Sequence, residues 1–510
     1  MNYEDIKKEL LESPEKLMQK KPFYRYVYDI KGMSGCGFLS DTDINETLQA
    51  EPTSLRVVPI SQDRFLMELN PQSHDVLFDE NIPSITMKLQ NGGWADIKFN
   101  RVAVPYQKLI KNKQVLHLTG NPLNHTLLVE NPTETQSNNF ILVKQFWKKR
   151  NQDGMRTKMV DVQKSMGDAG LLYYFNYKGE IKSRILSYKD GYVLCTHRDN
   201  NGDVILESVV YEKDNVKYID SYDDKYMYRY KNDANEDEKG EKTGWVKEKP
   251  KKHGFNEIPL ISKRGEVAWD SVQSVIETYE VIYNVFLAIQ KRFGWGVLYI
   301  KGNYDEKGKK LAGNIILNDT SYDGKGDAKF LTPPSPDNTI DTLQSLEDTI
   351  QKGSGTTFIL PKDISMSGDK SGIAIEITMS MDIETALQDC IEWQNVADKM
   401  MRLFKFGLAK ELYNKDRKKY KNIITDFEDL EIHSEFTVWK PRSEYEFNQM
   451  IQMMTEGGVL SFETGTELCT LSKPDEKARI AREEKEEEEK EKRKEEREVQ
   501  VKGFTNAQNK

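Results

Sequence analysis

The chain has 510 residues, which is enough for about three to four domains and too many for a single core. Charged residues make up 31% of it and apolar residues 37%, and no window approaches the roughly eighteen apolar residues of a membrane span. The net charge of −9, from 74 basic and 83 acidic residues, argues against a protein that coats DNA, because such proteins carry a basic excess.

The first half of the chain predicts helices followed by strands. Residues 3–20 predict a short amphipathic helix, and residues 100–123 predict a second one that stops at Gly120. The run "FILVKQFWKKR" predicts a third. Several short runs rich in Tyr, Val and Ile, separated by turn residues, then predict an antiparallel meander over 170–231. The polar stretch 232–252 predicts an exposed linker.

The middle of the chain predicts two helices on either side of a small β-containing insert. Residues 253–261 predict an apolar strand, and 268–293 predict a helix of about seven turns with apolar side chains every three or four residues. The insert at 294–338 contains two predicted strands, "WGVLYIKG" and "GNIILND", with Lys-rich turns. Residues 339–352 predict the second helix.

The last part of the chain is mostly helical in pattern. A loop rich in Gly and Ser leads into a predicted long helix from about Gly372 to Tyr413, and residues 430–441 alternate like a strand. The runs "SEYEFNQMIQMM" and "SFETGTELCTL" predict two helices split by "TEGG". Residues 483–498 are all charged, ten acidic and six basic, and predict an exposed helix with Glu–Lys pairs four positions apart.

Cysteine and histidine spacing predicts no metal or disulfide chemistry. The four cysteines are far apart and include no Cys-x-x-Cys pair, and no two of the six histidines have the spacing of a metal pair. We therefore expect no metal site and no cofactor, and a reduced cytoplasmic setting.

The stretch "GTTFILPKDISMSGDKSGIAIEI", residues 355–377, is the strongest candidate for a nucleotide site. A Walker loop needs Gly directly before its Lys and a strand leading into it. Here Asp369 precedes Lys370 and a predicted helix comes first, so the pattern disfavours nucleotide binding. Motifs G-x-S-x-G and H-E-x-x-H are also missing from the sequence. The Lys-rich turns 305–310 and 325–329 fit either phosphate contacts or ordinary β-turns.

The order of the parts resembles the portal proteins of tailed bacteriophages, in the siphovirus-type family. The runs "HGFNEIPLI" and "WDSVQSVIETYEVIYN" look like that family's strand and first stem helix. The run "NRVAVPYQKLIKNKQVLHLTGNPL" is similar to its N-terminal helix, and "DAGLLYYFNYKGEIKSRILSYKDGYVL" to its wing strands. The run "SGDKSGIAIEI" resembles the start of its long helix, and the segment from "SEYEFNQM" onward resembles its C-terminal helices and acidic end. The resemblance covers roughly residues 100–490.

This resemblance implies an α+β portal fold made of a mixed α/β wing, a helical stem, a small clip, a long wing helix and a helical crown. The implied parts are a wing over 1–262, a first stem helix over 263–293, a clip over 294–338, a second stem helix over 339–352, a tunnel loop over 353–372, a long wing helix and strand over 373–441, and a crown with a charged tail over 442–510.

The resemblance also implies a function without catalysis. The family forms a homo-oligomeric ring, usually a dodecamer, at one capsid vertex of the virion, and double-stranded DNA is packaged and ejected through it. Implied partners are the terminase large subunit, a head-tail adaptor protein, and the major capsid and scaffolding proteins, with assembly in the host bacterial cytoplasm. Two alternatives stay open: a nucleotide-dependent DNA-processing enzyme, or a structural adaptor ring that carries no DNA.

Three groups of site residues follow from the resemblance. The residues implied to face DNA in the tunnel loop are Lys362, Asp363, Ser365, Met366, Ser367, Asp369 and Lys370. The residues implied to dock the motor or adaptor in the clip are Lys307, Lys309, Lys310, Lys325 and Lys329. The residues implied to form the subunit interface in the stem are Val272, Ile276, Tyr279, Tyr283 and Phe286.

Overall fold

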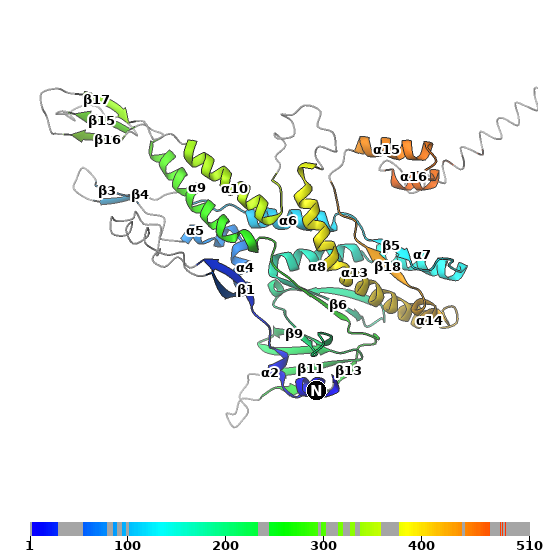
Figure 1. Cartoon of the computed structure of the whole chain (residues 1–510). Coiled ribbons are helices and arrows are strands. Elements are labelled where there is room, and N and C mark those ends of the chain that lie inside the picture. The colour runs from blue at the N-terminus through cyan, green and yellow to red at the C-terminus, as the bar shows by residue number, and fades with distance from the viewer. Residues whose placement is uncertain are drawn as a thin grey trace, which may run out of the picture. The chain divides into compact units, whose positions relative to one another are not determined.

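The computed structural model (Figure 1) divides into two compact units. The described residues are 3–28, 55–78, 85–88, 94–97, 101–232, 244–293, 297–301, 315–319, 327–331, 337–358, 377–440, 444–469, 480, 482 and 485. The first unit spans Met1–Phe358 and Met381–Trp439, and the second spans Ile359–Ser380 and Lys440–Lys510. Helices and mostly antiparallel strands make the chain α+β, which confirms the α+β part of the predicted fold.

A three-stranded antiparallel sheet organises the first unit. Its order is β14-β6-β7, and its strands are β6 (Asp168–Phe175), β7 (Ile181–Leu186) and β14 (Leu260–Arg264). Side chains alternate between its faces, so Leu171 and Tyr173 join the main helical core while Leu172 packs on a second sheet. The sheet is therefore covered by helices on one face and by strands on the other.

The main core lies between this sheet and a group of helices. They are α6 (Tyr106–Thr119), α7 (Glu134–Lys149), α8 (Gln152–Met166), α13 (Ser380–Lys415) and α14 (Ile423–Glu428). Within the core, Trp147 and Phe404 are buried and meet edge to face, with ring centroids 5.3 Å apart. The short strands β5 (Asn124–Leu127) and β18 (Ile432–Glu435) pair beside it. The sequence did not predict α8, because that helix is largely polar.

The predicted meander is correct for strand content but wrong as a single sheet. Its first two runs, β6 and β7, belong to the three-stranded sheet described above. The remaining four form consecutive antiparallel strands: β8 (Val193–Arg198), β9 (Val204–Lys213), β10 (Val216–Tyr222) and β11 (Tyr226–Asn232). The short η2 (Tyr188–Asp190) separates the two groups. Leu186 and Val209 help to pack the two sheets face to face.

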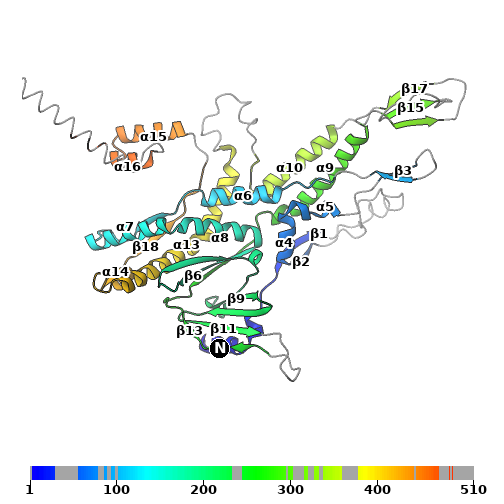
Figure 2. The ribbon, with the colours of Figure 1, turned by 180° about the vertical axis from the view of Figure 1, so that it is seen from behind.

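The N-terminal helices cover the outer face of the meander (Figure 2). They are α1 (Tyr3–Glu12) and α2 (Pro14–Leu17), where the sequence predicted one helix over 3–20. Proline cannot continue a helix from the preceding turn, so Pro14 starts a new one. Leu17 is fully buried with Ile219 and Tyr230 of the meander.

The predicted linker at 232–252 is partly wrong. Two short strands, β12 (Val246–Lys247) and β13 (Lys251–Lys252), add to the edge of β11 by antiparallel pairing. Their side chains are exposed, as the polar sequence predicted. Residues 233–243 lie outside the described part of the chain.

A buried carboxylate lies where the two sheets meet. Glu207 of β9 is 2% exposed and accepts hydrogen bonds from Ser262 Oγ at 2.6 Å and Thr196 Oγ1 at 2.9 Å. Burial raises the pKa of Glu207 to about 7, although the two hydroxyls and the charge of Lys399 oppose the rise. Its protonated form is therefore favoured by folding.

We expect Glu207→Gln to flatten the dependence of stability on pH. The raised pKa in the folded chain means that the contribution of Glu207 to stability is full below pH about 4.5 and falls by about 3 kcal/mol as pH rises through about 7. Urea unfolding at pH 5.5 and at pH 8, which spans about 2 kcal/mol of this fall, is measured in the variant and in wild type. Glu212→Gln, an exposed change on the same strand, is the control and should leave the fall unchanged. Equal falls in all three chains would contradict the prediction.

The N-terminal region also contributes strands and helices beside the first long helix of the predicted pair, α9 (Gln273–Phe293). The strands are β1 (Phe23–Tyr28) paired with β2 (Leu55–Ile60), and β3 (Ile85–Lys88) paired with β4 (Trp94–Ile97). The helices are α4 (Gln62–Leu69), η1 (Pro71–Ser73) and α5 (Asp75–Phe78). Phe65 of α4 is buried with Trp269 and Ile276, so this region shares a core with the first long helix.

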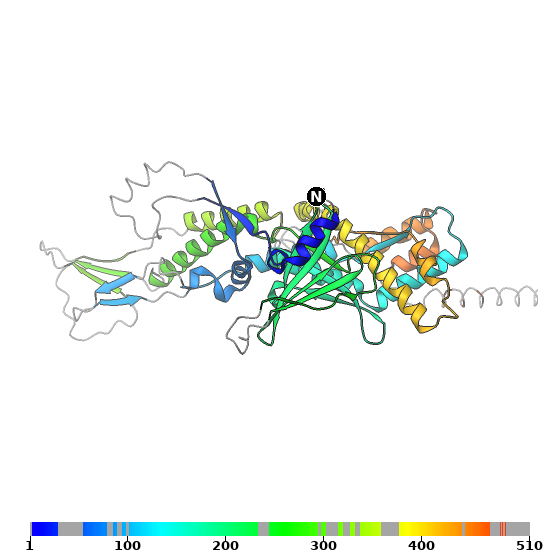
Figure 3. The ribbon, with the colours of Figure 1, turned by 90° about the horizontal axis from the view of Figure 1, so that it is seen from below.

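Two long helices pack side by side in the first unit, as Figure 3 shows for the green α9 and yellow-green α10. Helix α9 (Gln273–Phe293) follows η3 (Asp270–Val272), and α10 (Asp337–Ser354) is longer at both ends than the predicted 339–352. Between them lie β15 (Val297–Lys301), β16 (Ile315–Asp319) and β17 (Asp327–Leu331). The insert has a third strand that the sequence did not predict, and β15 pairs in parallel with β16 and antiparallel with β17.

The second unit contains two short helices that match the predicted pair. They are α15 (Glu444–Glu456) and α16 (Phe462–Leu468). The break falls at Gly457 and Gly458, and Gly458 adopts a φ of +72°, which favours glycine at the end of a helix. Most of the charged run 483–498 lies outside the described residues.

Candidate functional site

The described part of the candidate loop is its base, where α10 ends and α13 begins. The backbone N–H of Thr357 donates to both carboxylate oxygens of Asp382, at 3.2 and 3.1 Å. The hydroxyl of Thr385 donates to the carbonyl of Gly355 at 3.2 Å. Residues 359–376 lie outside the described part of the chain, but the residues on either side of them are held together.

Helix α6 donates two hydrogen bonds to this base. Gln114 Nε2 donates to the carbonyl of Ser354 at 2.9 Å, and the ammonium of Lys113 donates to the carbonyl of Thr357. Burial lowers the pKa of Lys113, although the charge of Asp382 opposes this. Two residues of one helix therefore hold the backbone where α10 ends and the loop begins.

An aromatic contact ties the same base to the first long helix. The ring of Phe358 stacks on Tyr106 with centroids 5.4 Å apart, and Tyr106 meets Tyr279 of α9 edge to face at 5.2 Å. The backbone N–H of Phe358 donates to Gln351 Oε1 at 2.7 Å. The base is thus fixed by side chains from α6, α9, α10 and α13.

We expect Gly355→Ala to weaken this base. Gly355 has a φ of +59°, and a Cβ there would overlap the hydroxyl of Thr385. The left-handed backbone alone costs a non-glycine residue about 1–2 kcal/mol, and the overlap adds to it. Gly191→Ala is the matched control, because its φ is +82° and nothing lies within 4 Å of an added Cβ. Urea unfolding should show the larger loss for Gly355→Ala, and equal losses would contradict the packing argument.

Most of the residues predicted for the tunnel loop and the clip lie outside the described residues. This applies to Lys362, Asp363, Ser365, Met366, Ser367, Asp369 and Lys370, and to Lys307, Lys309, Lys310 and Lys325. Lys329 lies on β17, where its backbone pairs with Tyr299 of β15. Their predicted contacts with DNA or with docking proteins therefore remain predictions.

The predicted interface stripe on α9 and η3 is corrected at two positions. Val272 is 1% exposed and Ile276 is 0% exposed, because both pack in a core cluster of this chain with Ile350 of α10. They leave no surface for a neighbouring subunit. Tyr279, Tyr283 and Phe286 are half-buried and keep part of their surface free.

The sequence analysis missed a line of buried polar residues on α9. Glu280 and Asn284 are 2% and 1% exposed and lie one helical turn apart. Glu280 Oε1 accepts from the N–H of Val104 at 2.7 Å and lies 2.7 Å from His74 Nδ1. Asn284 bonds both the N–H and the carbonyl of Val102, each at 2.7 Å. Polar residues at helical spacing inside an apolar helix were the signal that could have revealed this line.

The histidine in this line has a perturbed pKa. Burial lowers the pKa of His74, but the hydrogen bond and charge of Glu280 outweigh burial and raise the pKa overall. Its Nε2 lies 2.8 Å from the carbonyl of Glu68. His74 therefore links the N-terminal region to α9 through its contact with the carboxylate of Glu280.

Glu68 of α4 is the centre of a second buried network. It is 3% exposed and accepts from both terminal nitrogens of Arg25, at 2.6 and 3.1 Å. It also accepts from Arg64 Nε at 3.1 Å and from Trp269 Nε1 at 2.8 Å. Arg25 in turn contacts Asp270 at 2.7 Å. These contacts attach the N-terminal region to the start of the first long helix.

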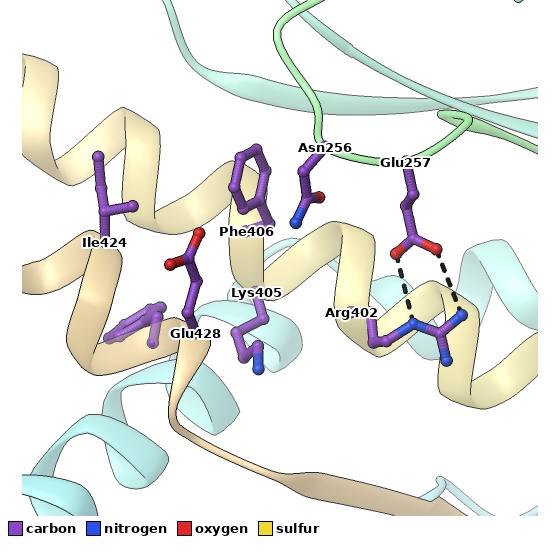
Figure 4. Close-up of a pocket in the computed structure, with 8 residues that line it drawn as sticks. Asn256, Glu257, Arg402, Lys405, Phe406, Ile424 and Glu428 are labelled. Atoms are coloured by element: carbon purple, nitrogen blue, oxygen red, sulfur yellow. Dashed lines mark hydrogen bonds and ion pairs between the residues drawn. The ribbon is translucent and has the colours of Figure 1, made fainter. Parts of the chain in front are cut away.

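A small pocket lies between α13 and α14 (Figure 4). Its volume is about 260 Å³, below the range of about 300–1,000 Å³ usual for ligand pockets. Arg402 points to Glu257 and donates to it at 3.4 and 3.3 Å, and Lys405 donates to the carbonyl of Leu430 at 2.6 Å. Both cations already have acceptors from the same chain.

The described residues show neither a metal centre nor a membrane helix. They contain no group of three or more His, Cys, Asp or Glu side chains placed to hold a metal ion. Among the helices that the structure describes, none combines the length and apolar character needed to cross a membrane.

Comparison with known protein families identifies the family of this chain. A family model described as "Phage portal protein, SPP1 Gp6-like" matches residues 95–491. No curated protein matches the sequence. The family match covers most of the chain and begins after β1, β2, α4 and α5.

Proposed function

The chain belongs to the SPP1 Gp6-like family of phage portal proteins, and from this premise we propose how its parts serve the DNA channel. A phage portal forms the channel at a capsid vertex through which DNA is packaged, so the chain is a virion component that works in a multimeric ring. The family is structural rather than enzymatic. The match over residues 95–491 is the observation that carries this conclusion.

We propose that the ring is a dodecamer with the division of parts implied by the sequence. Residues 1–262 and 373–441 form the wing, 263–293 and 339–352 the stem, 294–338 the clip, and 442–510 the crown and tail. The packing of α9 against α10, with a small sheet between them in sequence, supports the stem and clip. Tyr279, Tyr283 and Phe286 offer half-buried aromatic surface for a neighbouring subunit, a residue type enriched at interfaces.

We propose that the tunnel loop, residues 353–372, faces the DNA. The contacts of Thr357 with Asp382 support this, because functional loops are held at their ends by a rigid scaffold. The seven predicted DNA-facing residues include two lysines and two aspartates, so their charges cancel. Each phosphate neutralised by a protein adds affinity, so a balanced loop in a chain of net charge −9 lets DNA slide.

We propose further that the clip lysines dock the terminase large subunit during packaging and the head-tail adaptor protein afterwards. ATP hydrolysis then belongs to the motor, and the portal itself needs no catalysis and no cofactor. The same ring would serve DNA ejection and would meet the major capsid and scaffolding proteins during assembly in the host bacterial cytoplasm.

The test is the DNA content of particles assembled with and without the protein. Capsid, scaffolding and motor proteins of the same phage are combined with the full chain, and nuclease-protected DNA is measured. We expect protected DNA only when the chain is present. Equal protection without it would overturn the proposed function.

A further inference from the structure

A cavity of about 1,070 Å³ opens beside the edges of the two sheets of the first unit. Strands β8 and β14 each end their sheet, so each pairs with a single described strand and has an edge that no described strand covers. The hydroxyls of Thr196 on β8 and Ser262 on β14 lie 2.9 Å apart and join the two edges. The segment 16–21 after α1 adds a further wall.

Cationic side chains dominate the lining of this groove. Two carboxylates line it, Asp168 and Asp199, against six cations: Lys16, Lys20, Lys21, Arg198, Lys263 and Arg264. Asp168 is already paired with Lys20, and Asp199 accepts from the N–H groups of its own turn. The groove is therefore positive in a chain whose net charge is −9.

Three of these cations form no ion pair with a described carboxylate, although Asp168 lies near enough to Arg264, and Glu207 to Arg198, to interact with their charge. Among the residues that the structure describes, Lys21, Arg198 and Arg264 have no carboxylate within ion-pair distance. Arg198 donates to the carbonyl of Gly202 at 2.7 Å, and Arg264 donates to that of Pro22 at 2.8 Å. Those neutral acceptors orient the two guanidinium groups but leave their charge available.

The shape and the apolar part of the lining narrow the choice of ligand. Ile6, Leu10 and Leu194 contribute apolar surface beside the charges. A free phosphate would fill a small fraction of the volume and would not use that surface. A DNA duplex needs a broad basic surface that meets many phosphates, whereas the cations here line one groove that also has uncovered strand edges.

We propose that this groove binds an acidic, extended segment of a partner protein, with apolar residues between its carboxylates. Its backbone would pair with an uncovered strand edge, which is a common way to bind an extended peptide. Its carboxylates would meet Lys21, Arg198 and Arg264 through charge-assisted hydrogen bonds. This inference does not rest on the proposed function.

Fluorescence anisotropy of the full-length chain tests the proposal. The probe is a labelled peptide that repeats Asp-Glu-Leu, and the same peptide with Asn-Gln-Leu is its uncharged partner. We expect the acidic peptide to bind and the uncharged one to bind at least about tenfold more weakly, since charge complementarity supplies the recognition. The double change Lys21→Glu and Arg198→Glu should reduce affinity for the acidic peptide by at least about tenfold.

The control variant also replaces two cations with glutamates, but at positions outside the groove. Lys178→Glu and Lys189→Glu alter two exposed lysines outside the groove and should leave peptide affinity near the wild-type value. Lys21→Gln with Arg198→Gln, checked by circular dichroism, separates loss of charge from misfolding. The proposal is overturned by absent peptide binding, by equal loss in the control, or by duplex DNA or inorganic phosphate binding in preference to the peptide.

Discussion

Deletion of residues 362–369 is expected to spare the ring and to reduce packaged DNA to nearly the level seen without the portal. The deletion removes most of the predicted DNA-facing residues but leaves the base intact. Asp382 still holds Thr357, and Gln114 still holds Ser354, because all four residues lie outside the deleted segment. The measurements are nuclease-protected DNA per particle and ring formation by electron microscopy.

The control for this deletion removes the same number of residues from another polar segment. Deleting 234–241 from the predicted linker shortens the chain equally, at a place with no predicted DNA contact. We expect its packaging to be close to that of wild type. If the 362–369 deletion also packages and retains DNA normally, the loop is not where the portal meets its DNA.

Replacing Glu68 with Ala should destabilise the first unit strongly. The change removes a carboxylate that Arg25 and Arg64 share and that accepts from Trp269, whose N–H then has no acceptor there. Removing one partner of a buried ion pair costs about 3–5 kcal/mol when the other charge is left unpaired. We expect a loss near the lower end of that range, because Arg25 keeps Asp270, and Arg64 keeps Asp75 and Glu277. Urea unfolding followed by tryptophan fluorescence measures the loss.

An exposed ion pair provides the comparison for Glu68. Glu9 contacts Lys16, and their side chains are 47% and 43% exposed. Exposed pairs contribute about 0–1 kcal/mol, so Glu9→Ala should barely move the unfolding midpoint. Equal midpoints for Glu68→Ala and Glu9→Ala would show that the N-terminal region does not stabilise the first long helix through this network.

The region around Glu68 and α9 also shows which features could be predicted from the sequence and which could not. The apolar repeat of 268–293 predicted α9 well, because spacing within a helix is local information. The family resemblance placed Val272 and Ile276 of this stripe at a subunit interface, whereas Phe65 and Ile350 bury them within the chain. Contacts between residues that are far apart in sequence are not contained in a local pattern.

The sheets illustrate the same limit. The short Tyr- and Val-rich runs predicted strands correctly, but nothing in them indicated that β6 and β7 pair with β14 rather than continue into β8. The partner is almost a hundred residues away, since β14 ends at Arg264 and β6 begins at Asp168. For the loop, residue spacing and glycine content disfavoured a nucleotide site. That Asp382 accepts a hydrogen bond from the backbone N–H of Thr357 could be seen only in the structure.

A portal must form a closed ring around an opening wide enough for DNA. Electron microscopy of the purified full-length chain, with class averages viewed along the ring axis, tests this most directly. We predict closed rings of uniform subunit number with an open axial channel. Monomers without rings at every concentration, or rings whose axis is filled with protein density, would contradict the proposed role in DNA passage.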